Sequence, residues 1–189
     1  MAKTHDYGGR MTDSKKRKKT FFEFFAGGGM ARLGLGAGWE CLFANDFDRQ
    51  KADVYVENFG NGHFHYGDVG ALTLRDLPAT APDLVWASFP CQDLSLAGAR
   101  RGLDGARSGV FHAFWSLMRA AARDGRGPRA VVLENVAGLL TSNGGADFRL
   151  VIETLAKSGY AVSALVLDAA AFTPQSRRRV FIFGFDPAH

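Results

Sequence analysis

The chain has 189 residues, of which 47% are hydrophobic and 22% charged, and its formal net charge is +4. These values are typical of one folded domain that builds a core without disulfide or metal staples. Two cysteines cannot form a disulfide framework, no Cys/His cluster has zinc-site spacing, and no apolar run approaches the roughly 20 residues of a membrane span. We therefore expect a protein of the reducing cytoplasm, with no metal and no membrane contact.

The positive charge is concentrated at the N-terminus. Residues 1–19 contain seven Lys or Arg and two Asp, a net charge of +5, which leaves −1 for residues 20–189. Because this segment has almost no large apolar side chains, we expect a disordered basic tail over 1–19 and a folded domain over 20–189. The tail is either a solvated extension or an arm that contacts phosphates.

From residue 20 onward, short apolar runs alternate with segments of helical period. The apolar runs predict strands at 21–26, 41–45, 63–66, 84–87, 130–133, 161–168 and 180–185. Apolar residues spaced i, i+3, i+4 and i+7 predict amphipathic helices around 111–118 and 148–155, the second stopped by Gly159. This alternation predicts an α/β fold with a doubly wound, mostly parallel seven-stranded sheet, in which ligands bind beyond the carboxyl ends of the strands.

A glycine turn follows the first predicted strand, at Gly27, Gly28 and Gly29. The missing β-carbons let a ligand approach the backbone, and the start of the next helix attracts negative charge. Asp46 lies about 20 residues further on, where a carboxylate commonly binds ribose hydroxyls, and Asp68 ends the next strand, where it could meet an adenine amine. Together they predict a pocket for an adenosine-containing cofactor, although each aspartate alone is equally well explained as a turn or helix cap.

Cys91 follows Pro90 and precedes Gln92 at the root of a long irregular segment, 89–109. A lone cysteine is most often a buried structural residue, and this interpretation suits Cys41, which lies within an apolar strand. The polar neighbours of Cys91 instead favour a partly exposed nucleophile. A segment of this length inside a compact domain is usually functional, so we expect a lid, with a surface insertion as the alternative.

Glu134 ends the apolar run 130–133 and precedes Asn135. A carboxylate in this position is desolvated and can hold or share a proton near neutral pH, which suits a catalytic acid. A helix cap or an ion pair is the alternative interpretation. The strand of Glu134 should neighbour the one that leads to Cys91, so a nucleophile and a proton donor would face one substrate.

The run at 175–179 places Arg177 and Arg179 on one side of an extended chain. Two guanidinium groups on one side suit a phosphate, a carboxylate or a substrate carbonyl. A solvated strand edge is the alternative interpretation.

In their order and spacing these motifs resemble those of the DNA (cytosine-5) methyltransferases. The resemblance rests on Phe-Ala-Gly-Gly-Gly at 25–29, Asn-Asp at 45–46, Gly-Asp at 67–68, Phe-Pro-Cys-Gln at 89–92, Glu-Asn-Val at 134–136 and Gln-x-Arg-x-Arg at 175–179. The Asn/Asp-Pro-Pro-aromatic motif of the amino-methyltransferases does not occur in the chain. The resemblance covers residues 20–185 and implies a Rossmann-like fold that uses S-adenosyl-L-methionine.

The resemblance also implies a reaction, in which a methyl group passes from S-adenosyl-L-methionine to carbon 5 of a cytosine flipped out of double-stranded DNA, leaving S-adenosyl-L-homocysteine. It implies that Cys91 forms a covalent adduct and that the other catalytic residues are Glu134, Arg177 and Arg179. The residues it implies at the cofactor are Phe25, Gly27, Gly28, Gly29, Asp46, Phe47, Asp68, Val69 and Pro90. The residues it implies at the substrate are Gln92, Ser95, Asn135 and Gln175.

Family members usually continue beyond the Gln-x-Arg-x-Arg strand with a target-recognition domain, a further conserved segment and a C-terminal helix, which these 189 residues do not contain. We therefore expect a catalytic lobe that works with a second subunit or lobe for target recognition, in a bacterial cytoplasm or nucleoid and in restriction-modification or gene regulation. The charge of −1 on residues 20–189 agrees, because binding the DNA backbone needs clustered Lys and Arg. Two alternatives are a truncated, non-catalytic module that binds S-adenosyl-L-methionine and an RNA cytosine-5 methyltransferase.

Overall fold

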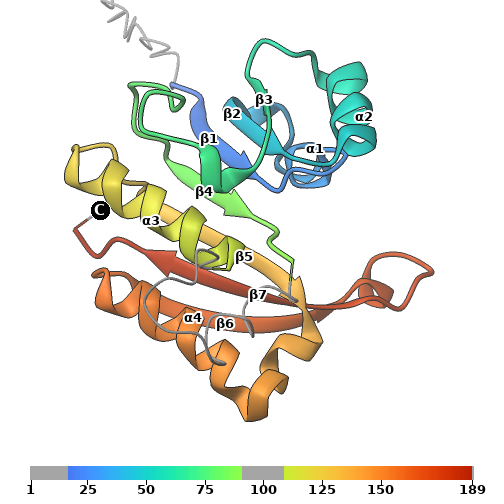
Figure 1. The fold of residues 1–189 in the computed structure, drawn as a ribbon. Helices are drawn as coiled ribbons and strands as arrows, with labels where there is room; N and C mark the ends of the chain where they lie inside the picture. The colour runs from blue at the N-terminus through green and yellow to red at the C-terminus, as the bar shows by residue number, and fades with distance from the viewer. Residues whose placement is uncertain (1–16, 91–108, 189) are drawn as a thin grey trace, which may run out of the picture.

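The computed structural model describes residues 17–90 and 109–188 (Figure 1). Within these ranges the strands are β1 (Lys19–Phe24), β2 (Trp39–Asp46), β3 (Phe64–Tyr66), β4 (Leu84–Ala87), β5 (Ala130–Val136), β6 (Ala161–Asp168) and β7 (Arg178–Phe185). The α-helices are α1 (Met30–Leu35), α2 (Arg49–Phe59), α3 (Val110–Arg123) and α4 (Ala146–Lys157). None of these helices is long and apolar enough to cross a membrane.

All the strands belong to one sheet, in the order β3-β2-β1-β4-β5-β7-β6. The first five run parallel, whereas β7 is antiparallel to both of its neighbours, β5 and β6. The predicted fold, a doubly wound and mostly parallel seven-stranded sheet, is therefore confirmed. The strand order reverses between β1 and β4, so the carboxyl ends of these two strands flank the point at which such sheets bind ligands.

The observed strand boundaries differ from the predicted ones where pairing is long-range. The prediction for β5 ends at residue 133, but the strand continues through Val136 because Asn135 and Val136 pair with β7. At the N-terminus, β1 begins at Lys19, inside the predicted tail, and the Lys19 ammonium lies 5.4 Å from the centre of the Trp39 ring. Residues 1–16 of the predicted tail and residues 91–108 of the segment predicted as a lid, 89–109, lie outside the described residues.

Helices α3 and α4 lie side by side on one face of the sheet, as Figure 1 shows, and bury the main core. The predicted apolar stripe of α3 is confirmed, because Phe111, Phe114, Trp115 and Met118 are all at most 3% exposed. Gly159 follows α4 with φ +94°, as its predicted role of helix stop requires. On the opposite face, α1 and α2 pack against β1 and β2.

Candidate active site

A pocket of about 500 Å³ opens at the carboxyl ends of β1, β2, β3 and β4, and its size is in the range that suits a small ligand. The segments that follow the four strands supply most of its wall, and the first turns of α2 and α3 supply the rest. The lining residues are Phe25, Gly27, Asn45, Asp46, Phe47, Lys51, Gly67, Asp68, Val69, Ser88, Pro90 and Val110. The pocket thus lies at the sheet edge where the sequence predicts a ligand.

The glycine turn lines the pocket at one residue and packs against α2 at the other two. Gly27 lines the pocket, with φ +55°, and its backbone N–H donates to Asp46 Oδ2 over 2.7 Å. Gly28 and Gly29 instead face α2. A β-carbon on Gly28 would lie 3.4 Å from the Val54 side chain, and one on Gly29 would overlap the Phe59 ring. These two glycines therefore let the turn approach α2 closely.

Both predicted aspartates line the pocket, and both also act as caps. Asp46 is 6% exposed and accepts hydrogen bonds from the backbone N–H groups of Gly27 and Asp48, over 2.7 and 2.8 Å. Asp68 accepts from the Gly70 N–H over 2.8 Å and so begins η2 (Val69–Ala71). Each carboxylate oxygen has a further lone pair, so these caps leave both aspartates able to accept bonds from a ligand.

The wall of the pocket fits an adenosine group. The Phe47 side chain is 65% exposed at the rim, which leaves its ring free to stack on a base. Val69 is buried and contributes apolar surface, while Asp46 supplies acceptors suited to ribose hydroxyls. Phe25, in the left-handed region with φ +55°, packs its ring edge-on against Phe114 at 6.2 Å.

Several lining residues were not among the predicted site residues, namely Asn45, Lys51, Gly67, Ser88 and Val110. Asn45 is 1% exposed, and its amide donates to the carbonyls of His65 and Gly67 over 2.9 and 2.8 Å, which ties β2 to the turn after β3. The Asn-Asp and Gly-Asp pairs at the strand ends are the sequence signal for Asn45 and Gly67. No such signal marks Lys51, which pairs with Asp48 at 3.2 Å in the first turn of α2.

Glu134 forms an ion pair with Arg179, with 2.9 Å between Oε1 and Nε. The two side chains are 21% and 20% exposed. Arg179 stands opposite Val136 in the antiparallel pairing, so the ion pair runs diagonally across β5 and β7. The sequence left open a catalytic acid, a helix cap or an ion pair for Glu134, and in the structure Glu134 forms an ion pair. Its strand does neighbour β4, which leads to Pro90.

Asn135 joins the end of β5 to the segment that leaves β4. Its side chain is buried, and its amide donates to the Phe89 carbonyl over 2.9 Å while its oxygen accepts from the Val136 N–H over 2.8 Å. The β4–β5 pairing ends at Ala87, so this side-chain bond holds the next part of the chain against β5. Pro90, one residue further on, reaches the pocket.

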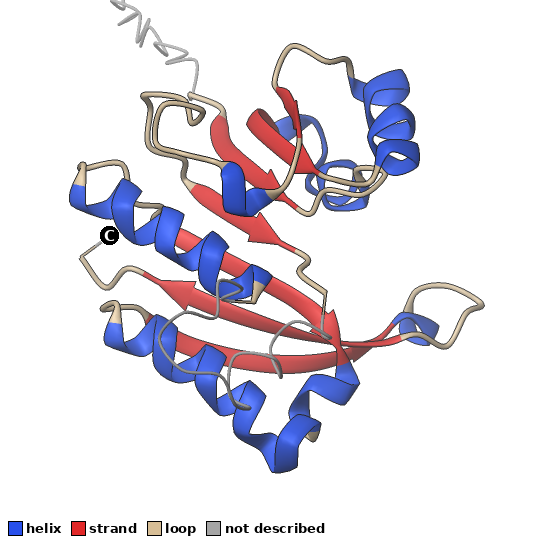
Figure 2. Ribbon diagram, viewed as in Figure 1, coloured by secondary structure: helices blue, strands red, loops and turns tan. Residues whose placement is uncertain are grey.

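Among the described residues, Gln175 and Arg177 do not line the pocket. Gln175 and Arg177 are exposed in the loop between β6 and β7, which projects beyond the rest of the sheet (Figure 2). The backbone N–H of Arg177 donates to Asp168 Oδ1 over 2.8 Å. Cys91, Gln92 and Ser95 lie outside the described residues.

A family model described as C-5 cytosine-specific DNA methylase matches residues 19–189. The chain belongs to this family of DNA methylases. Among curated relatives of this chain, Type II methyltransferase M.BsuFI of Bacillus subtilis is 36% identical over 172 residues, 90% of this chain and 40% of the relative. Type II methyltransferase M.HaeII of Haemophilus aegyptius is also 36% identical, over 90% of this chain and 51% of the relative. The chain thus spans about half the length of these relatives.

Solved structures show the same fold. The structure of S. pombe Dnmt2 methyltransferase aligns with a TM-score of 0.71 at 24% identity, over 88% of this chain and 50% of the other. A putative DNA modification methyltransferase encoded within an E. coli prophage aligns with a TM-score of 0.68 at 19% identity, over 90% and 47% of the two chains. At these identities the likeness concerns the fold alone.

Proposed function

We propose that the chain is the catalytic lobe of a DNA (cytosine-5-)-methyltransferase, and that a second lobe or subunit supplies target recognition. The observation that carries the proposal is the family match over residues 19–189, and it is supported by a pocket at the carboxyl ends of β1 to β4. The Type II relatives support DNA as the substrate. They are about twice as long as this chain, which supports a further lobe as the DNA-binding part.

For the cofactor we propose S-adenosyl-L-methionine, which supplies a methyl group activated by a positive sulfonium. Asp46 would accept hydrogen bonds from the ribose hydroxyls, and Phe47 would stack on the adenine. Asp68 would accept from the adenine amine, and Val69 would pack against the base. The Gly27 backbone, with Phe25 and Pro90, would border the amino-acid end.

For the chemistry we propose a covalent route through Cys91. Its thiolate bonds to carbon 6 of a flipped cytosine, and the ring electrons make carbon 5 nucleophilic. Glu134 binds ring nitrogen 3 and the exocyclic amine, while Arg179 orients Glu134 and Arg177 stabilises charge on the pyrimidine carbonyl. Carbon 5 bonds to the methyl carbon, whose former bond to sulfur breaks with its electrons left on sulfur. A solvent base removes the carbon 5 proton, the bond to Cys91 breaks, and 5-methylcytosine and the thiolate are released.

The test is labelled methyl transfer to duplex DNA by the chain mixed with the polypeptide that its neighbouring reading frame encodes. We expect transfer by the wild type, none by Cys91→Ser, and a covalent adduct with a duplex containing 5-fluorocytosine. A control variant, Cys41→Ser, should retain transfer, because burial raises the pKa of the Cys41 thiol to about 11 and leaves it protonated at neutral pH.

Two results would contradict the proposal in different ways. Cofactor binding by calorimetry without any adduct, when the partner is present, would identify a non-catalytic binding module. Methyl transfer to tRNA with none to duplex DNA would identify an RNA methyltransferase. Gln92, Ser95, Asn135 and Gln175 are proposed to lie on the substrate side in either case.

A further inference from the structure

Glu23 is a charged residue in the middle of an apolar strand. It lies in β1 between Phe22 and Phe24, its side chain is 1% exposed, and its Oε2 has no hydrogen-bond partner among the described residues. A buried carboxylate without full hydrogen bonding is strongly disfavoured, because desolvation penalises its charge. The proposed mechanism does not use this group, so its position requires a separate explanation.

A cluster of polar side chains from several elements surrounds Glu23. Arg32 of α1 donates to the Tyr55 hydroxyl of α2 over 3.1 Å and also contacts the His63 ring. The Tyr55 hydroxyl lies 3.3 Å from His63 Nε2 and 3.5 Å from the Cys41 sulfur of β2. These contacts couple α1, α2 and β2 beneath the glycine turn. We name these residues the Glu23 cluster: Glu23, Arg32, Cys41, Tyr55 and His63.

The glycine turn is held between two buried carboxylates. At its start, the Gly27 N–H donates to Asp46. At its end, in the first turn of α1, the backbone of Arg32 lies beside the Glu23 carboxylate and favours its charged form, which opposes the rise in its pKa. Because Asp46 repels Glu23, each charge affects the other. A change of charge on Glu23 therefore alters one of the two anchors of a turn that lines the pocket.

Glu23 is the member of this cluster that titrates near neutral pH. Burial raises the pKa of Glu23 to about 7, against the opposing effect of Arg32, and repulsion from Asp46 adds to the increase. Burial also raises the pKa of Cys41 to about 11 and that of Tyr55 well above its usual range. Burial and the nearby Arg32 charge lower the pKa of His63, so its ring is neutral when Glu23 ionises.

We propose that Glu23 is a positioning residue for the cofactor, whose ionised carboxylate fixes the first turn of α1 and with it the glycine turn. An ionised acceptor forms a stronger hydrogen bond than a protonated one, so the turn is best ordered when Glu23 is charged. Cofactor affinity then rises as Glu23 loses its proton, and cofactor binding reciprocally expels that proton. The identity of the cofactor in this inference rests on the proposed function.

The first test is calorimetry with S-adenosyl-L-homocysteine between about pH 6 and about pH 8, in buffers of different ionisation enthalpy. For the wild type we expect the dissociation constant to fall about tenfold over this range, with a proton released on binding. For Glu23→Gln we expect a dissociation constant that is independent of pH, with no proton released. The matched control is Glu57→Gln, on the exposed side of α2, which should behave as the wild type.

A second readout keeps the inference separate from the proposed function. Without any cofactor, the isotope-labelled amide signals of Gly27, Gly28 and Gly29 should shift together with a midpoint near pH 7 in the wild type and not in Glu23→Gln. The positioning role would be overturned if the wild-type amide signals did not change with pH, or if Glu23→Gln gave the same titration as the wild type. If the amides titrate as expected but no S-adenosyl-L-homocysteine binds at any pH, the proposed function fails, while the control of the glycine turn by Glu23 stands.

Discussion

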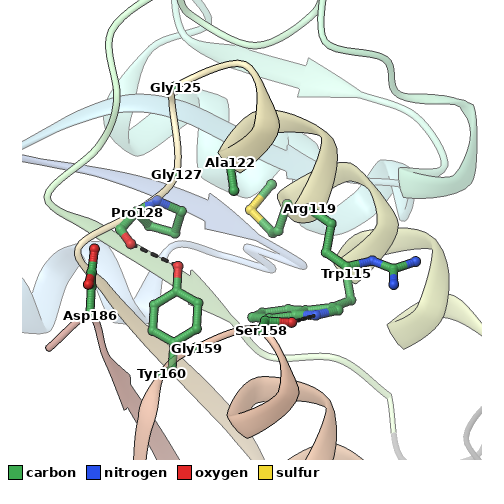
Figure 3. A pocket seen from close by; sticks show the side chains of 11 residues that line it. Trp115, Arg119, Ala122, Gly125, Gly127, Pro128, Ser158, Gly159, Tyr160 and Asp186 are labelled. Carbon is green, nitrogen blue, oxygen red and sulfur yellow. Dashed lines mark hydrogen bonds between the residues drawn. The ribbon is translucent and has the colours of Figure 1, made fainter. Parts of the chain in front are cut away.

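The two ends of the sheet carry cavities of different character. The pocket at the carboxyl ends, about 500 Å³, is bordered by strand-end turns, two aspartates and an exposed Phe47. A second cavity, about 350 Å³, lies at the opposite end between α3, α4 and the last strands (Figure 3). There the Trp115 indole N–H donates to Ser158 over 3.1 Å, and the Tyr160 hydroxyl donates to the Pro128 carbonyl over 2.8 Å. These two polar groups are already satisfied within the protein.

One carboxylate at each end follows the same division. Asp83, at the amino ends of the strands, accepts from the Thr20 N–H over 2.8 Å and from the Arg17 guanidinium over 2.8 Å. Glu23, on the side of the glycine turn, has an oxygen with no partner in the described part of the chain. The comparison teaches that hydrogen bonding distinguishes the two ends in the same direction as cavity volume does. The polar groups at the amino ends of the strands form hydrogen bonds within the fold. At the carboxyl ends, Asp46 and Asp68 can still accept hydrogen bonds from a ligand.

The largest predicted effect is at the carboxyl end, in Glu134→Gln. The amide cannot form the ion pair with Arg179 or transfer a proton as a carboxyl group does, so methyl transfer should fall about a thousandfold, equivalent to about 4 kcal/mol. Single-turnover transfer measures the change. Calorimetry should show the affinity for S-adenosyl-L-homocysteine unchanged.

The matched control for Glu134→Gln is Glu153→Gln, which removes an exposed ion pair with Lys157 on α4. It should transfer methyl groups at the wild-type rate. If both variants were equally active, the Glu134–Arg179 pair would be structural and the functional contrast between the two ends would lose its main support.

The second effect concerns Asp46→Asn. The substitution replaces one of the two carboxylate oxygens, which accept from the Gly27 and Asp48 N–H groups, with an NH2 group that cannot accept, so cofactor affinity should fall about thirtyfold, or about 2 kcal/mol. Calorimetry measures the loss. Asp76→Asn is the control, because Asp76 also accepts two hydrogen bonds, both from Thr73, but lies on the surface. Equal cofactor affinity in Asp46→Asn and Asp76→Asn would mean that Asp46 caps the turn without binding the cofactor.

The sequence predicts the strands and their polar ends better than it predicts which strands and side chains pair with one another. The four strands with polar ends were predicted from apolar runs, and parallel pairing alone brings their ends to one edge. The insertion of β7 between β5 and β6 was not predicted, because no local pattern specifies an antiparallel neighbour. For that reason Glu134 could be placed on its strand, whereas its ion pair with Arg179 could not be distinguished from a free carboxylate.

The glycine turn shows a second limit of the sequence. Three adjacent glycines predict a close approach of backbone to ligand, and only Gly27 lines the pocket. Gly29 is required because the Phe59 ring of α2 packs against it, which spacing does not reveal, whereas a β-carbon on Gly28 would make an ordinary contact with Val54. Glu23 was available as a signal, since a carboxylate inside a run of phenylalanines has no simple structural purpose, but its neighbours come from distant parts of the chain.

The third prediction uses the pH dependence of the free energy of unfolding to distinguish the two ends of the sheet. Burial by itself would raise the pKa of Asp83, but the hydrogen bonds from Thr20 and Arg17 outweigh it and lower the pKa. A carboxylate whose folded pKa lies below its unfolded value stabilises the fold above the unfolded pKa, and this stabilisation is lost as pH falls through the folded pKa. Asp83→Asn should therefore lower the free energy of unfolding by about 1–2 kcal/mol at neutral pH and much less at about pH 3.

Urea denaturation at the two pH values measures this difference, with Asp53→Asn as the control. Asp53 forms an exposed ion pair with Arg49 on α2, so its loss should change stability little at either pH. Cofactor affinity should be unchanged in Asp83→Asn. A loss of stability that did not depend on pH would mean that Asp83 acts through its shape and not through its charge.

The smallest effect tests the cavity at the amino end directly. Tyr160→Phe removes the hydroxyl that donates to the Pro128 carbonyl, so the free energy of unfolding should fall by about 1 kcal/mol. Burial and the nearby Asp186 raise the pKa of Tyr160 to about 12, so this bond persists across the pH range in which Glu23 titrates. Tyr160→Phe should therefore lower the free energy of unfolding, while its cofactor affinity should equal that of the wild type at every pH. A severalfold change in affinity would instead couple the two ends, and the amino end would have to be treated as part of the binding machinery.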